Sequence, residues 1–186
     1  GNDLTINNDG TFSFPSQLDG SAYAVTVFTE PGNPNQTCTV TPPSSGNVAG
    51  SDVTFVVNCS TNTYTVGGTV TDLSGSGLVL QNNSGDDLPI NINGDFTFTT
   101  AIDDGSSYAV TVLTQPTTPD QTCSVSNDRG TLAGSNVINV DITCVNNIVL
   151  GTVTALYATN GANWNDYVLD DRIDPYPFSA SDTICD

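Results

Sequence analysis

Short segments in which apolar and polar residues alternate recur along the chain, separated by clusters of Gly, Asn, Asp and Ser. Alternation with a period of two is typical of β-strands that bury one face. No stretch shows the three- and four-residue apolar spacing of an amphipathic helix. We therefore expect an all-β fold, and between residues 64 and 145 we expect seven strands: 64–73, 78–82, 88–92, 96–99, 108–114, 122–126 and 137–144.

The pattern repeats along the chain. The pairs Tyr23 and Tyr108, Cys38 and Cys123, and Cys59 and Cys144 are each separated by 85 positions. A repeat of this size with many short strands predicts tandem β-sandwiches of the immunoglobulin-like type. The expected domains are an incomplete first repeat at 1–60, a complete second repeat at 61–145, and a strand-donating tail at 146–186.

The first repeat contains only five of the seven strand segments: 4–6, 11–14, 23–29, 37–41 and 53–59. It begins at Gly1, in register with Gly85, so we expect it to lack its two opening strands. A sandwich without these strands exposes the inner faces of its sheets and leaves backbone groups unpaired along their edges. The predicted acceptor surface for an added strand consists of Leu4, Ile6, Phe12, Phe14, Tyr23, Val25, Val27 and Val57.

A sequence like the missing opening follows the second repeat. Residues 151–156 (Gly-Thr-Val-Thr-Ala-Leu) resemble residues 68–73 (Gly-Thr-Val-Thr-Asp-Leu), and residues 167–169 can take the place of 78–80. Trp164, the only Trp, lies just before that second segment and is expected to anchor a core or an interface. The predicted donor residues are Ile148, Val149, Gly151, Val153, Leu156, Trp164, Tyr167, Val168 and Leu169.

The cysteine pattern indicates an oxidising compartment. Cys38 and Cys59 lie 21 positions apart, as do Cys123 and Cys144, which suits one disulfide within each repeat. Cys185 is left over, and three fates remain open: a bond to another chain, a bond to residues beyond this segment, or a free thiol. A chain that begins at Gly1 and contains no Met is expected to be a processed protein or a portion of a longer one.

The charge is strongly acidic, with a formal net charge of −18 and only two basic residues, Arg129 and Arg172. Such a surface repels nucleic acid and anionic lipid, so we expect neither as a partner. No apolar run has the length of a membrane helix, so membrane insertion is not expected. The triplets that begin at Asn35, Asn58 and Asn82 permit N-linked glycans.

The residue types needed for common catalytic sites are missing. Without His or Lys, a Ser/His/Asp, Cys/His or Schiff-base site cannot be assembled, so we expect no enzyme. Paired carboxylates could still serve a glycosidase, but they fall in or beside predicted turns of a small sandwich. No cofactor is expected, although clustered carboxylates suit calcium, and the candidate ligands are Asp86, Asp87, Asp103 and Asp104.

Several phrases of the sequence resemble tandem immunoglobulin-like repeats of large secreted or surface-attached bacterial proteins. They are residues 68–83, Tyr-Ala-Val-Thr-Val at 23–27 and 108–112, and Gln-Thr-Cys at 36–38 and 121–123. Residues 160–168 also look like a segment that follows such repeats. The resemblance implies an extracellular array of sandwiches and carries over no catalytic residues. The missing opening of the first repeat departs from the pattern.

Two functions are consistent with these observations. The first is a structural subunit of an extracellular bacterial filament, in which the tail completes the first repeat of the next copy by β-strand complementation. Because donor and acceptor are different surfaces, its partners would be further copies of the same chain in an open helical or linear polymer. The alternative is a spacer or adhesin segment of a longer surface protein, in which upstream residues complete the first repeat.

Overall fold

The computed structural model describes residues 2–148 of the 186-residue chain. The predicted donor residues from Val149 onward, and Cys185, lie outside the described residues. The described part contains strands and no helix, so the predicted all-β fold is confirmed. Among these residues, nothing forms a helix long and apolar enough to cross a membrane.

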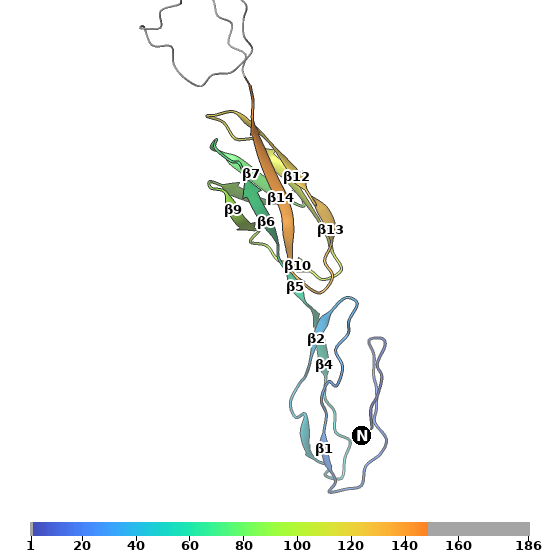
Figure 1. Ribbon diagram of the computed structural model, residues 1–186. Helices are drawn as coiled ribbons and strands as arrows, with labels where there is room; N and C mark the ends of the chain where they lie inside the picture. The colour runs from blue at the N-terminus through green and yellow to red at the C-terminus, as the bar shows by residue number, and fades with distance from the viewer. Residues whose placement is uncertain (1, 149–186) are drawn as a thin grey trace, which may run out of the picture. The chain divides into compact units, whose positions relative to one another are not determined.

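The second repeat is a sandwich of two four-stranded sheets (Figure 1). One sheet has the order β13-β11-β7-β8, and the other has the order β12-β14-β6-β9. A short pair, β5 and β10, lies at the end of this repeat that adjoins the first. The strands are β5 (Thr63–Tyr64), β6 (Val66–Thr71), β7 (Leu78–Asn82), β8 (Asp86–Ile90), β9 (Gly94–Thr97), β10 (Ile102–Asp103), β11 (Ser107–Thr114), β12 (Gln121–Ser126), β13 (Arg129–Thr131) and β14 (Val137–Asn146).

The two opening strands of this repeat occupy inner positions in the two sheets. β6 pairs in parallel with β14 on one side and antiparallel with β9 on the other. β7 pairs antiparallel with both β11 and β8. β8 and β9 each lie at one edge of a sheet, so β8 pairs only with β7 and β9 pairs only with β6. Without β6 and β7, each sheet would be cut in two.

The core of the second repeat lies between the sheets. Alternation along β11 buries Tyr108 and Val110, and alternation along β14 buries Val140, Ile142 and Cys144, as the sequence pattern predicts. Leu78 and Leu80 of β7 and Val66 and Val70 of β6 complete the two facing layers. The buried hydrophobic residues are Val66, Val70, Leu73, Leu78, Leu80, Ile90, Phe96, Phe98, Tyr108, Val110, Cys123, Leu132, Val140, Ile142 and Cys144.

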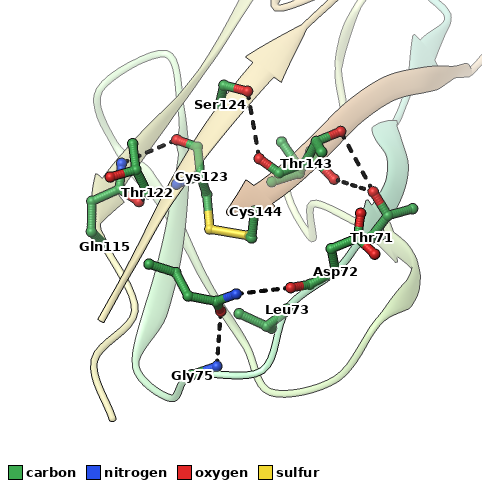
Figure 2. Close-up of a disulfide and its surroundings, with 12 residues drawn as sticks. Thr71, Asp72, Leu73, Gly75, Gln115, Thr122, Cys123, Ser124, Thr143 and Cys144 are labelled. Atoms are coloured by element: carbon green, nitrogen blue, oxygen red, sulfur yellow. Dashed lines mark hydrogen bonds between the residues drawn. A yellow bond between two sulfur atoms is a disulfide. The ribbon is translucent and has the colours of Figure 1, made fainter. Parts of the chain in front are cut away.

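Each repeat contains one disulfide, in agreement with the cysteine spacing. Cys38 bonds to Cys59 and Cys123 bonds to Cys144, in both cases between directly paired positions of two antiparallel strands. Figure 2 shows the second of these beside Gln115, whose side chain accepts a hydrogen bond from the Cys123 N–H at 2.7 Å. Two disulfides indicate a compartment outside the reducing cytoplasm.

The first repeat contains two separate strand pairs. They correspond to the β11-β13 and β12-β14 pairs of the second repeat, and within residues 2–61 there is no counterpart of β6 or β7. The segments 4–6 and 11–14, predicted as strands, form none. The pairs are β1 (Ala22–Ala24) with β3 (Ser45–Asn47), and β2 (Gln36–Val40) with β4 (Val57–Thr61).

This failure of two predicted strands has a physical cause. Residues 4–6 and 11–14 correspond to β8 and β9, the strands whose only sandwich partners are β7 and β6. Segments with strand-like patterning cannot form a ladder when the neighbouring strand is missing. The predicted strand 23–29 also shortens to β1, since the counterpart of β1 in the second repeat pairs with β7 over much of its length.

The predicted strand 53–59 begins four residues later, as β4, and the other predicted boundaries shift by two residues or fewer. β8 and β9 each begin and end two residues before the predicted segments. The short strands β3 and β13 were not expected, because Ser45–Asn47 and Arg129–Thr131 contain a Gly and carry no apolar alternation. Both pair with the strand that contains the repeated Tyr, Tyr23 in β1 and Tyr108 in β11.

Candidate assembly surface

Equivalent positions of the two repeats differ in burial. Tyr108 and Val110 are 7% and 1% exposed, whereas their counterparts Tyr23 and Val25 are only partly buried. The same contrast separates Ile142 from Val57. None of the fully buried hydrophobic residues belongs to residues 2–61. The first repeat thus has core-type side chains without a closed core.

The predicted acceptor residues near the start of the chain are open to solvent. Leu4 and Ile6 are 43% and 48% exposed, although their counterparts Leu88 and Ile90 pack in or against the second core. Phe12 and Phe14 are partly buried and contact a third ring, that of Phe55. The ring centroids lie 5.8 to 6.3 Å apart in the three pairs.

Phe55 belongs to this surface but was not among the predicted acceptor residues. Its counterpart in the second repeat is Val140, which is fully buried. The signal was present in the sequence, because Phe55 lies two residues before Val57 and so shares its face of a strand. Phe55 therefore extends the predicted acceptor set, which stays a prediction.

The missing neighbours of this surface can be inferred from the second repeat. There, Val140 pairs with Gly68 and Ile142 pairs with Val70 in the parallel β14-β6 ladder. The counterparts of Val140 and Ile142 are Phe55 and Val57, and no strand within the described residues lies beside them on that side. An added strand would find backbone groups and an apolar face at the same place.

Gly68 shows which residue type this position requires. A Cβ atom at Gly68 would lie 1.7 Å from the carbonyl oxygen of Val140, so only glycine allows the strands to approach this closely. The tail sequence keeps a glycine at the equivalent position, Gly151. It departs at the preceding position, where Leu150 stands in the place of Gly67.

A buried glutamine holds the loop that joins β6 to β7. The side-chain oxygen of Gln121 accepts hydrogen bonds from the N–H groups of Ser74 and Gly75, both at 2.8 Å, and its amide donates to Asp72 O at 2.9 Å. Figure 2 shows this loop at Asp72, Leu73 and Gly75, next to the Cys123–Cys144 disulfide. The counterpart Gln36 is only partly buried, and its amide contacts Thr61 at 3.4 Å. Among the described residues, Gln36 thus lacks the loop contacts that Gln121 makes.

The two repeats contact each other through Asp104, which is buried at their junction. Its carboxylate accepts hydrogen bonds from the N–H of Asn35 in the first repeat at 2.6 Å and from the N–H of Gly134 at 2.7 Å. These two bonds, that from Asn35 foremost, hold the pKa of Asp104 below its usual range against the opposing effect of burial. The junction therefore favours the ionised carboxylate.

This pKa shift predicts acid sensitivity of the junction. Folding lowers the pKa of Asp104. The contribution of its carboxylate to the unfolding free energy is therefore complete above the unfolded pKa of about 3.9, and it is lost as the pH falls through the folded pKa. We expect the unfolding free energy of the chain to decrease below about pH 4, and to decrease less in Asp104→Asn. Urea unfolding between about pH 2 and pH 6 measures this. Equal acid dependence in both chains would contradict the assigned role.

The predicted calcium ligands do not come together. No group of three or more Asp, Glu, His or Cys side chains that could hold a metal ion occurs in residues 2–148. Asp86 and Asp87 lie on β8, and Asp86 Oδ2 accepts a hydrogen bond from the N–H of Thr100 at 3.0 Å. Asp104 uses both oxygens to accept from backbone N–H groups, and Asp103 lies in the short strand β10. Within residues 2–148, the four candidate carboxylates therefore do not gather into a shared calcium site.

One of the three glycosylation triplets is incompatible with the fold. The side chain of Asn82 is 2% exposed, and its oxygen accepts a hydrogen bond from the N–H of Ala109 at 3.2 Å. A glycan cannot be attached to a buried amide in the folded protein. Asn58 is exposed on β4, and Asn35 lies partly buried at the junction.

No protein-family model matches the chain, and no curated protein matches it by sequence. The architecture supports an all-β sandwich-type fold, and no comparison adds membership of a family of tandem immunoglobulin-like repeats. The second repeat has the two packed antiparallel-rich sheets expected of a β-sandwich.

Proposed function

We propose that this protein is a structural, non-enzymatic subunit of an extracellular filament that assembles head to tail by β-strand complementation. The observation that carries the proposal is the contrast between the repeats. The second has inner strands β6 and β7 and a buried core, whereas the first has neither within its described residues. The first repeat therefore needs two strands from outside itself.

The tail of another copy is the proposed source of these strands. Residues 151–156 match residues 68–73 at five of six positions, with glycine at the position where β6 requires it. In the second repeat, β6 follows directly on the end of the first repeat along the chain. The tail likewise follows directly on β14. Each donated tail would thus enter the next first repeat as β6 enters the second.

Burial of apolar side chains favours assembly. Complete burial of an aliphatic or aromatic side chain stabilises by about 1.5–3 kcal/mol. The acceptor surface consists entirely of such side chains, all partly or largely exposed, and the apolar donor residues add their own burial. Because donor and acceptor are different surfaces, the contact is heterologous and propagates as an open polymer.

A chain that ends at Ile148 tests the proposal. It keeps every described contact but lacks the tail, so we expect it to remain monomeric at concentrations where the full chain forms filaments. Its residues 2–61 should exchange amide hydrogens rapidly, while residues 66–144 remain protected. A synthetic peptide of residues 147–172 should bind and protect the first repeat.

The same experiment separates the alternative. If the chain is a spacer or adhesin in which upstream residues complete the first repeat, the peptide will not bind and the full chain will not polymerise. The same peptide with Gly151→Val serves as the matched control, and equal binding of both peptides would contradict the proposed register.

A further inference from the structure

The two repeats have the same local structure at the end from which the chain leaves each repeat, around Asn62 in the first and Asn147 in the second. Three hydrogen bonds recur there at positions 85 residues apart. They are Gln36 N–H to Pro31 O (3.1 Å) and Gln121 N–H to Pro116 O (3.2 Å), Asn62 N–H to Asn35 O and Asn147 N–H to Asp120 O (both 2.9 Å), and Thr37 Oγ1 to Asn62 Oδ1 (2.7 Å) and Thr122 Oγ1 to Asn147 Oδ1 (2.8 Å).

The opposite ends of the repeats also agree. Asp19 Oδ1 accepts a hydrogen bond from Gly50 N–H, and Asp104 Oδ1 accepts one from Gly134 N–H, each at 2.7 Å. The turns around these carboxylates share further backbone bonds. They are Ser21 N–H to Leu18 O (3.1 Å) and Ser106 N–H to Asp103 O (3.0 Å), and Val48 N–H to Ser21 O (2.9 Å) and Leu132 N–H to Ser106 O (3.0 Å).

One bond breaks this equivalence. Asp104 Oδ2 accepts from the N–H of Asn35, in the preceding repeat, at 2.6 Å. Within residues 2–148, Oδ2 of Asp19 accepts no hydrogen bond and the N–H of Asp120 donates none. Asp120 is the counterpart of Asn35. The described part of the chain thus has a carboxylate oxygen, Asp19 Oδ2, and a backbone N–H, that of Asp120, which could form the same hydrogen bond between two copies.

We propose that neighbouring copies meet through a second version of this junction, in which Asp19 accepts from Asp120 N–H of the preceding copy. The inference rests on the proposed head-to-tail assembly and names the surface by which the folded bodies touch. The internal junction also pairs Asp103 with Thr63 through β10 and β5. The equivalent pair between copies is Leu18 with Ile148, which are 81% and 73% exposed in the single chain.

The tail is two residues shorter than the internal connection that it copies. Four steps lead from Asn147 to Gly151, whereas six lead from Asn62 to Gly68. Each residue of an extended chain spans about 3.3 Å, so the tail covers less distance than the internal connection. To keep the same register, a donated strand therefore needs a first repeat that is also shorter at this place.

The first repeat is shorter at the same level on both flanks of the acceptor position. Five steps lead from Phe14 to Asp19, against six from Phe98 to Asp104. On the other flank, five steps lead from Gly50 to Phe55, against six from Gly134 to Val140, where β14 carries a bulge between Val137 and Val140. The tail and the segments that flank the acceptor position are therefore both shorter than their counterparts in the second repeat. This agreement in length is expected if the tail inserts into the first repeat.

Paired cysteines test the junction in the full chain with Cys185→Ser. Both native disulfides join directly paired antiparallel positions with Cα atoms 4.0 and 3.9 Å apart. Leu18→Cys with Ile148→Cys should therefore give a ladder of covalent oligomers on mild oxidation. Thr63→Cys with Asp103→Cys is the matched internal pair and should close within one chain. Leu18→Cys with Ile138→Cys, also on exposed positions, controls for random collision.

Filaments observed by negative-stain microscopy in the same samples separate the two proposals. Filaments without a ladder would overturn the junction and leave strand complementation standing. Absence of both would overturn both, and a ladder no stronger than that of the collision control would also count against the junction.

Single substitutions give a second readout that does not depend on cysteine chemistry. Asp19→Asn keeps an oxygen for Gly50 N–H but turns an N–H₂ group toward Asp120 N–H, so the concentration needed for assembly should rise at least about tenfold. Asp120→Asn creates the residue found at the internal junction and removes a carboxylate near Asp19, so that concentration should fall. Unchanged assembly in both variants would contradict the junction.

Discussion

Replacing Gly151 by Val is expected to abolish assembly while leaving residues 2–148 folded as before. The reason lies in the second repeat, where a Cβ at Gly68 would lie 1.7 Å from the Val140 carbonyl oxygen. If Gly151 enters the first repeat at the equivalent position, beside Phe55, any side chain there prevents the close approach of the donated strand. Analytical ultracentrifugation and negative-stain microscopy of the purified chain measure this loss.

Two controls make the result specific. Thr152→Ser alters the neighbouring position, whose counterpart Thr69 is partly exposed and carries a side chain without conflict, and should leave assembly intact. Gly68→Val applies the same change inside the second repeat and should destabilise that repeat by about 3 kcal/mol or more. Filaments of Gly151→Val that form at the wild-type concentration would contradict the proposed register.

A charge in the acceptor surface should block assembly and leave the stability of the unassembled chain almost unchanged. Val25→Asp is expected to leave the unassembled chain about as stable as before, because Val25 is only partly buried. It should block filament formation, since complementation would bury an unpaired carboxylate at a cost of several kcal/mol. Circular dichroism melting and light scattering measure the two effects on the same sample.

The matched substitution is Val110→Asp, at the equivalent position of the second repeat. Val110 is 1% exposed in a closed core, so this variant should unfold the second repeat even without assembly. Equal loss of stability in Val25→Asp and Val110→Asp would show that the first repeat already has a closed core, and it would then need no donated strand.

The fold of the second repeat was largely predictable because its residues agree at every level. The alternation of Tyr108 with Val110, and of Val140 with Ile142, sets which face of each strand is buried. The matched cysteine spacing placed both disulfides. Short strands such as β13 escaped prediction, because hydrogen bonding to β11 and not local patterning creates them.

The first repeat was harder to predict, because its local sequence and its surroundings disagree. Residues 4–6 and 11–14 have the pattern of strands but lack the neighbouring strand that would pair with them. The junction carboxylate Asp104 could not be recognised as such, since its role depends on a loop 69 residues away. Sequence alone suggested a calcium ligand in its place.

Electron cryomicroscopy of the assembled protein tests strand complementation most directly. We expect the first repeat of every copy to contain a strand beside Phe55 and Val57 that traces continuously to residues 149–156 of the neighbouring copy, with Gly151 opposite Phe55. A first repeat closed by residues of its own polypeptide, or one that lacks a strand at that position in the polymer, would contradict the proposal.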